Sequence, residues 1–166
     1  MNRLTLFFIS SLVLISAGCV SVKLSTASDS TKRATGVEYR APGSPFGKIE
    51  SIDVDAAWKN SRNGNTISYL SDCRDPSDPP LDNIVQGVLA GLTELHTDTK
   101  DTVNIQGREG RRVLATGKVD GVPSTIDLLV FKRNQCIYIL TYLGVKTAFA
   151  ATREEFNKFI QGFQAP

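Results

Sequence analysis

The spacing of hydrophobic residues changes several times along the chain, and each change predicts a different element. Residues 37–40 alternate apolar and polar side chains, which predicts a short strand ended by Pro42. Asn63-Gly64 is typical of a two-residue hairpin turn, so residues 56–59 and 66–70 are predicted to pair as antiparallel strands. The folded region is therefore expected to begin with short strands.

Helical spacing follows in the middle of the chain. A helix is predicted over residues 79–93, with Asp78 as its N-cap and Pro79 at its first position. Its large apolar residues fall on one side and are Ile84, Val85, Val88, Leu89 and Leu92. This side is expected to pack on a sheet.

The second half alternates again and predicts an antiparallel meander. The expected strands are one that begins at Val103 and three over residues 111–119, 122–132 and 136–142, with turns at Asp120-Gly121 and Arg133-Asn134. In the strand over residues 122–132 both sets of alternate positions are mostly apolar. This strand is therefore expected to be covered on both faces.

A terminal helix completes the pattern. Thr152-Arg153-Glu154-Glu155 matches a capping box, and the helix after it carries an apolar stripe of Phe156, Phe159, Ile160 and Phe163. Together the elements predict an α+β fold, a mostly antiparallel β-sheet of five to seven strands packed with a middle helix and a C-terminal helix. This single domain is expected to span residues 36–166.

The N-terminus follows a different pattern, that of an export signal. Arg3 and the terminal amine are positive, and residues 4–15 are largely apolar. That stretch is too short to cross a bilayer, which takes about 20 residues, but it suits the core of a signal peptide. Small residues then precede Cys19. We expect a signal peptide over residues 1–18, and the alternatives are an ordinary secretory signal with a coincidental cysteine or a retained membrane helix.

Residues 16–19, Ser-Ala-Gly-Cys, resemble the bacterial lipobox, with Ser16 where leucine is commonest. The resemblance implies lipid attachment at Cys19, a diacylglyceryl thioether and usually an amide-linked acyl chain such as palmitate. Two or three chains anchor a protein stably. Val20, rather than aspartate, follows the cysteine, which favours the outer membrane with the domain facing the periplasm. Residues 19–35 are rich in serine and threonine and predict a lipidated flexible tether.

Export also changes the interpretation of the remaining cysteines. Cys73 and Cys136 would lie in a compartment that permits disulfides, so we expect them to be bonded to each other. A tetrahedral zinc site needs several cysteine or histidine ligands close together. The chain has one histidine, His96, and no CxxC motif, so local spacing does not supply such a set. A redox site would need CxxC or a neighbouring base. No metal and no cofactor is expected.

The charges are balanced along the chain. There are 19 basic and 17 acidic side chains, a formal charge of +2, and cleavage after Gly18 would remove Arg3 alone. The signs are interspersed, so nothing in the totals indicates binding to nucleic acid or to anionic lipid. Arg108, Arg111 and Arg112 form a local basic group, but with Glu109 among them they are expected to be a solvated strand edge.

The order of elements, with a tail that ends Phe-x-x-Phe-Ile-x-Gly-Phe, resembles the superfamily of PsbP-like extrinsic photosystem proteins, to which mycobacterial lipoproteins also belong. A nearer likeness is to small uncharacterised lipoproteins of Gram-negative bacteria, through Gly107-Arg108-Glu109-Gly110, Asp120-Gly121-Val122-Pro123 and a strand near a cysteine. These families offer no catalytic residues to carry over. The resemblance implies a non-catalytic binding or assembly role.

An enzyme would need a base beside a nucleophile, and the one candidate base is His96, with Asp98 to orient it. The alternative for His96 is an exposed residue at the end of an element. The sequence carries no Gly-x-Ser-x-Gly motif and no phosphate-binding loop. Glu154 and Glu155 suit the first turn of a helix without any catalytic role.

Three functions follow from these observations. The first is a membrane-anchored, non-catalytic module that binds an envelope protein through an open sheet face or edge. The second is a carrier of a small ligand or lipid held between the sheet and one helix. The third is a hydrolase that uses His96.

Overall fold

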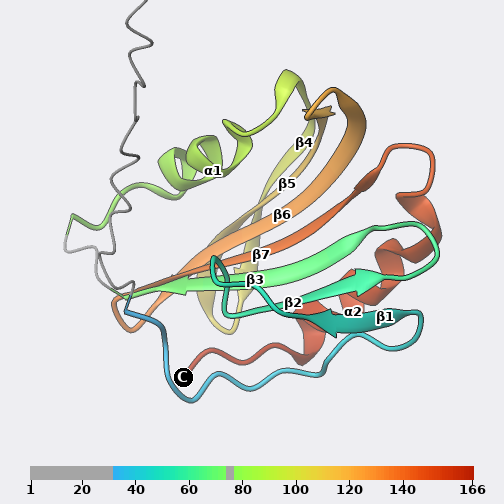
Figure 1. Ribbon diagram of the computed structural model, residues 1–166. Coiled ribbons are helices and arrows are strands. Elements are labelled where there is room, and N and C mark those ends of the chain that lie inside the picture. The colour runs from blue at the N-terminus through green and yellow to red at the C-terminus, as the bar shows by residue number, and fades with distance from the viewer. Residues whose placement is uncertain (1–31, 74–76) are drawn as a thin grey trace, which may run out of the picture.

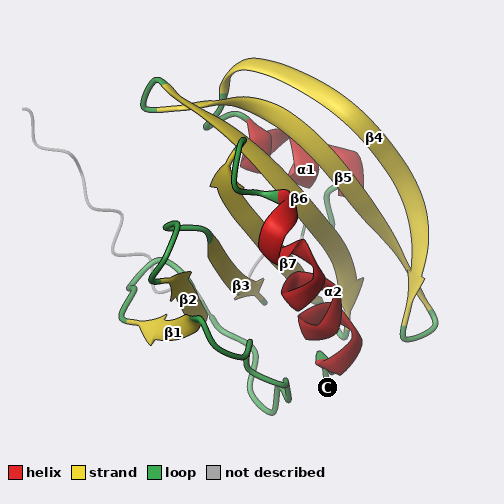
Figure 2. Cartoon of the chain, turned by 90° about the vertical axis from the view of Figure 1, so that its right-hand side faces the viewer, coloured by secondary structure: helices red, strands yellow, loops and turns green. Residues whose placement is uncertain are grey.

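The computed structural model describes residues 32–73 and 77–166. The predicted signal peptide, Cys19 and most of the predicted tether lie outside the described residues. The described chain forms one seven-stranded antiparallel sheet with a helix against each face (Figures 1 and 2). The expected α+β class, with a middle and a C-terminal helix, is confirmed.

The elements follow in the order β1 Phe46–Ile49, β2 Ala56–Asn60, β3 Thr66–Asp72, α1 Leu81–Leu89, β4 Thr93–Ile105, β5 Arg108–Val119, β6 Val122–Arg133, β7 Cys136–Val145, a 3-10 turn η1 Ala150–Thr152, and α2 Arg153–Gly162. Across the sheet the strand order is β1-β2-β3-β7-β6-β5-β4. The meander of β4 to β7 therefore joins the first hairpin through the β3–β7 pair, and β1 and β4 form the two free edges.

The core has two halves, one on each face of the sheet. On one face the three phenylalanines of the predicted stripe, Phe156 and Phe159 in α2 and Phe163 just after it, are buried. Phe156 packs on Tyr142, Phe159 on Trp58 and Phe163 on Tyr69. On the other face α1 places Val85 and Leu89 on the apolar residues of β5 and β6. Each such side chain contributes about 1.5–3 kcal/mol when buried. Residues 124–131 of β6 lie between the two halves and are all buried, as the double alternation predicts.

The middle helix is shorter than predicted, and the strand after it is longer. Helix α1 ends at Leu89 because the chain from Thr93 onward pairs with β5, beginning at Lys118. Val103 therefore lies near the end of β4 and not at its start. Ten consecutive residues of this strand are exposed, and without a buried face they carry no apolar alternation that sequence could detect.

Neither predicted helix cap is formed. Asp78 adopts a φ of 45°, and its carboxylate binds Lys132 on β6 at 2.6 Å, while Pro80 takes the N-cap position. Thr152 precedes α2, but its hydroxyl lies 2.8 Å from the hydroxyl of Tyr142 and caps no backbone N–H. In both places a contact with a neighbouring strand replaces the local hydrogen bond.

Two further expectations for the strands need correction. Residues 37–40 form no strand, because only Glu38 makes a bridge, to Gln164. The edge strand β1 was not predicted, since residues 46–49 show one buried residue and no alternation. The last turn lies at Asn134 and Gln135, with φ of 50° and 63°, one residue later than expected.

A strap, defined here as residues 32–45, runs along the sheet from the end of β3 to the start of β1 (Figure 1). Its first residues are the last of the predicted tether, yet they pack on the domain. Arg33 donates to the carbonyl oxygens of Ser71 and Asp53, and the backbone N–H of Ala34 donates to the hydroxyl of Ser71. The folded part therefore includes residues 32–35.

A buried polar cluster fixes the far end of the sheet to the start of α2. The amide of Asn65 donates to the hydroxyl of Tyr142, which in turn donates to the carbonyl of Phe149. Gly144 faces this cluster, and a Cβ there would lie 2.5 Å from Asn65. Only glycine therefore leaves room for the asparagine at this position.

Candidate binding surfaces

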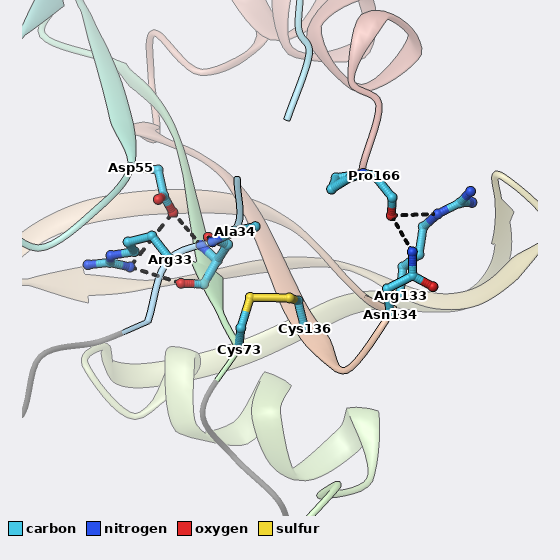
Figure 3. Close-up of a disulfide and its surroundings, with 9 residues drawn as sticks. Arg33, Ala34, Asp55, Cys73, Arg133, Asn134, Cys136 and Pro166 are labelled. Atoms are coloured by element: carbon cyan, nitrogen blue, oxygen red, sulfur yellow. Dashed lines mark hydrogen bonds and ion pairs between the residues drawn. A yellow bond between two sulfur atoms is a disulfide. The ribbon is translucent and has the colours of Figure 1, made fainter. Parts of the chain in front are cut away.

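The two remaining cysteines are bonded to each other, as predicted. Cys73 and Cys136 follow directly on the last β3–β7 pair, Asp72 with Ile137, and their Cα atoms are 4.1 Å apart. The bridge lies beside the first residues of the strap, with Arg33 and Ala34 nearby (Figure 3). It therefore joins the end of the first hairpin to the start of the meander's last strand. Cys19 lies outside the described residues.

His96, the candidate base, lies on β4 with its ring exposed to solvent. Its side chain is 75% exposed, and its Nε2 atom is 3.6 Å from the Oδ1 atom of Asp98. Within residues 32–73 and 77–166, the charged side chain that contacts this ring is Asp98. The structure thus brings together the predicted base and its orienting acid on an exposed strand, with Thr116 of β5 opposite His96. Among the described residues no hydrogen bond is found between the ring and a hydroxyl or thiol. No group of metal-binding side chains is found in these ranges either.

The predicted solvated edge around Arg108 is wrong for two of its three arginines. Strand β5 is an interior strand, so its alternate residues point to opposite covered faces. Arg111 lies toward α1 and its Nε donates to Asp82 at 3.1 Å. Arg112 lies toward α2 and binds Asp127 with two hydrogen bonds of 2.9 and 2.8 Å.

Asp127 is the centre of a charged cluster that the sequence did not indicate as such. Its side chain is 1% exposed, and it also accepts a 2.8 Å hydrogen bond from Arg153 of α2. Arg112 donates to Asn157 as well, so β5, β6 and α2 meet here. The hydrogen bonds that Arg112 donates to Asp127 raise the pKa of Arg112, so the guanidinium stays charged. The signal in the sequence was one aspartate within a buried strand.

Because both oxygens of Asp127 are bound by guanidinium groups, the cluster acts as a clamp between sheet and helix. Glu155 forms a second link from the same helix. It pairs with Lys158 at 2.7 Å and accepts from the backbone N–H of Gly43 in the strap. The hydrogen bond from Lys158, supported by Gly43, lowers the pKa of Glu155. Asp127 and Glu155 therefore both tie α2 to the rest of the domain, one to the sheet and the other to the strap.

Strand β4 forms a long free edge. It has 13 residues, and the first ten are exposed. Its ladder partner is β5 alone, with two irregularities in register, between Thr93 and His96 and between Thr97 and Thr99. Among the described residues nothing bonds to the backbone groups on its outer side. This edge can accept another strand.

Two hollows lie at the opposite side of the domain, where the strap meets β1, and they share Ser44. One, of about 320 Å³, is enclosed by the strap and α2 and includes Arg40, Glu155, Lys158 and Phe159. The other, of about 520 Å³, is shallow and lies along β1 and the end of β2. Neither of these two hollows lies between the sheet and a helix, where a carried ligand was expected.

Among the helices of residues 32–73 and 77–166, none has the length and apolar character that spanning a bilayer requires.

No family model matches the sequence, and no curated protein matches it. Solved structures do resemble the fold. The PsbP protein of Synechocystis sp. PCC 6803 (CyanoP) is 12% identical with a TM-score of 0.58, covering 79% of this chain and 87% of its own. LpqN of Mycobacterium tuberculosis, described as involved in cell envelope biogenesis, is 11% identical with a TM-score of 0.57, covering 84% and 88%.

A protein of unknown function from Pseudomonas aeruginosa, PA94, is 13% identical with a TM-score of 0.50, covering 74% of this chain and 82% of its own. At these identities the likeness concerns the backbone arrangement and not the residues of any site. The chain therefore has the fold seen in CyanoP and LpqN.

Proposed function

We propose that this protein is a lipid-anchored, non-catalytic module of the bacterial envelope that binds a protein partner through the free edge of β4. The lipobox-like residues 16–19 and the signal-like segment before them support export and anchoring at Cys19. The Cys73–Cys136 disulfide is in keeping with an oxidising compartment such as the periplasm. Val20 after the cysteine favours the outer membrane.

The observation that carries the docking role is the length and exposure of β4. A partner segment can add to such an edge by main-chain hydrogen bonds, and its side chains then provide specificity. Asp98 and Asp101 lie on this strand, and both are exposed. Opposite charges across a strand pair stabilise it, so the edge favours an extended partner segment that carries basic residues.

The anchor is tested by replacing the lipidated residue. In cells fed a labelled palmitate, we expect the wild-type protein to take up the label and Cys19→Ser to take up none, because serine offers no thiol for the thioether. Intact-mass measurement should show loss of residues 1–18 and addition of acyl chains in the wild type alone. Ser16→Leu is the matched control and should be labelled and cleaved as the wild type is. Equal labelling of the Cys19→Ser variant would remove the anchor from the proposal.

The docking edge is tested by photo-crosslinking in intact cells. A photoreactive residue at Thr99 or Asn104 of β4 should give one defined product with an envelope protein, several-fold stronger than the same residue at Gln86 of α1. All three positions are exposed, so exposure alone does not separate them. Mass spectrometry of the Thr99 product should locate the crosslink in an extended basic segment of the partner. Equal products from Gln86 and Thr99 would contradict docking at this edge.

A further inference from the structure

Basic side chains without an ion-pair partner gather where the strap meets β1 and β2. Arg40, Lys48, Lys59 and Arg62 are exposed, and none of them forms an ion pair with a described residue. Most basic residues of the meander differ, because Lys100, Arg111, Arg112, Lys118 and Lys132 are paired with acids, although the exposed Arg108 pairs with none that the structure describes. The near-neutral total charge therefore conceals a local excess of positive charge.

Three of these cations line the shallow hollow of about 520 Å³. Lys59 lies opposite Gly47 in the β1–β2 pair, whereas Lys48 lies opposite Trp58 and so starts on the other face of the pair, at the free edge that β1 forms. Arg62 follows in the turn after β2, which is held to the strap by the hydrogen bond from the N–H of Ser61 to the carbonyl of Pro45. No acidic residue lines this hollow.

The rest of the lining is hydroxyl and apolar. Ser44 and Ser61 offer hydroxyl groups, and Pro45 and Ile49 offer hydrocarbon surface, with Ile49 38% exposed. Ammonium, guanidinium and hydroxyl groups bind phosphate oxygens, whereas an exposed aliphatic side chain suits the acyl boundary just beneath a headgroup. The combination fits a phosphate attached to a hydrocarbon.

The start of the described chain lies at the other end of the same hairpin from Arg62. Arg33 donates at 3.0 Å to the carbonyl of Asp53, which lies in the connection between β1 and β2. Residues 20–31 would separate this point from Cys19, a root-mean-square reach of about 20 Å for a flexible chain. A lipid on Cys19 would therefore hold the β1–β2 hairpin close to the bilayer, although Glu50 and Asp53 add negative charge beyond the end of the hollow.

We propose that the hollow formed by Lys48, Lys59 and Arg62 binds the headgroup phosphates of anionic lipids and so sets the domain with its β1 edge on the membrane. Clusters of lysine and arginine near a membrane anchor attract anionic lipid, and the attraction is lost at high salt. This inference rests on the proposed anchor for its geometry. The β4 edge would then face away from the bilayer, since β1 and β4 end the sheet on opposite sides.

Lysine acylation of the intact lipoprotein in vesicles tests the orientation. In phosphatidylglycerol vesicles we expect the reactivity of Lys48 and Lys59 to fall several-fold relative to phosphatidylcholine vesicles, and to recover at high salt. Lys100 on the edge strand β4 and Lys118 on the neighbouring β5 lie on the other side of the sheet. They are internal controls and should react equally in both vesicles. Arg62→Gln should reduce the protection of both lysines, while Arg108→Gln, which removes the same charge from an exposed site in β5, should not.

Three outcomes would overturn the proposal. They are equal reactivity in both vesicles, uniform protection of all four lysines, and protection of Lys48 and Lys59 by inorganic phosphate alone, which would indicate a site for a small free anion. The result is distinguishable from failure of the anchor. Protection of Lys48 and Lys59 in anionic vesicles without palmitate labelling in cells would support lipid binding by the hollow and contradict the anchor at Cys19. Palmitate labelling without protection would support the anchor and contradict lipid binding by the hollow.

Discussion

Asp127→Ala is expected to lower the free energy of unfolding by about 3 kcal/mol, near the lower end of the range for breaking a buried ion pair. The substitution removes the carboxylate on which Arg112 and Arg153 converge and leaves two guanidinium groups at the sheet–helix boundary. The arginine side chains are 29% and 39% exposed, so each can turn toward water and recover part of its hydration. This relief places the expected loss at the lower end of the range.

Urea denaturation measures this loss, and hydrogen exchange locates it. The amides of α2 that donate within the helix should exchange faster in the variant, because Arg153 begins that helix and the clamp holds it to β6. Asp101→Ala is the matched control, since Asp101 is exposed and lies opposite Arg112 on β4. It should change stability by less than about 0.5 kcal/mol. A loss for Asp101→Ala equal to that for Asp127→Ala would show that general charge balance, and not the clamp, is responsible.

Loss of the disulfide is expected to have an effect of similar size. The bridge closes a loop of 63 residues, for which the chain-entropy relation gives about 4 kcal/mol at 25 °C as an upper value. The native sheet should persist without it, because seven residue pairs join β3 to β7 next to the bridge. The stabilisation therefore arises from restriction of the unfolded chain, so the double variant Cys73→Ala/Cys136→Ala should fold and unfold at a lower urea concentration.

Reduction provides the control for that measurement. Dithiothreitol should lower the stability of the wild type toward that of the double variant and leave the variant unchanged. Far-ultraviolet circular dichroism of the variant should match the wild type before the transition. A variant as stable as the oxidised wild type would contradict a stabilising role, and a reductant effect on the variant would point to a cause other than this bridge.

The two proposed surfaces lie at opposite edges of one sheet. Strand β1 carries the basic hollow, and the connection after its last residue contacts Arg33 near the start of the described chain, whereas β4 offers unpaired backbone groups. The clamp at Asp127 and the disulfide both lie in the strands between them. In the proposed arrangement the sheet holds the membrane contact and the partner contact apart, and the rigid strands fix their relative direction.

The sequence by itself determined the features that depend on neighbours along the chain. The pairing of β2 with β3, the turn at Asp120-Gly121, the two-sided burial of β6 and the phenylalanine stripe of α2 all follow from local turn chemistry and from periods of two or 3.6 residues. The two-residue turn predicted at Asn63-Gly64 is wrong, because a longer loop over residues 61–65 connects β2 to β3 and only Gly64 of the two has a positive φ. The Cys73–Cys136 pairing followed from there being two candidates once Cys19 is set aside. The anchor at Cys19 remains a prediction of the sequence.

Only the tertiary structure decided the features that depend on distant segments. Arg112 and Asp127 are 15 residues apart and meet because β5 and β6 pair, and Arg153 joins them because α2 crosses that face. The length of β4 could not be predicted from the sequence, because a strand exposed on both faces needs no alternation of apolar and polar residues. The basic hollow could not be predicted either, because the fold brings Lys48, Lys59 and Arg62 to one region of the surface. Electrostatic attraction depends on the distance between charges in space, and the net charge of the sequence gives no such distance.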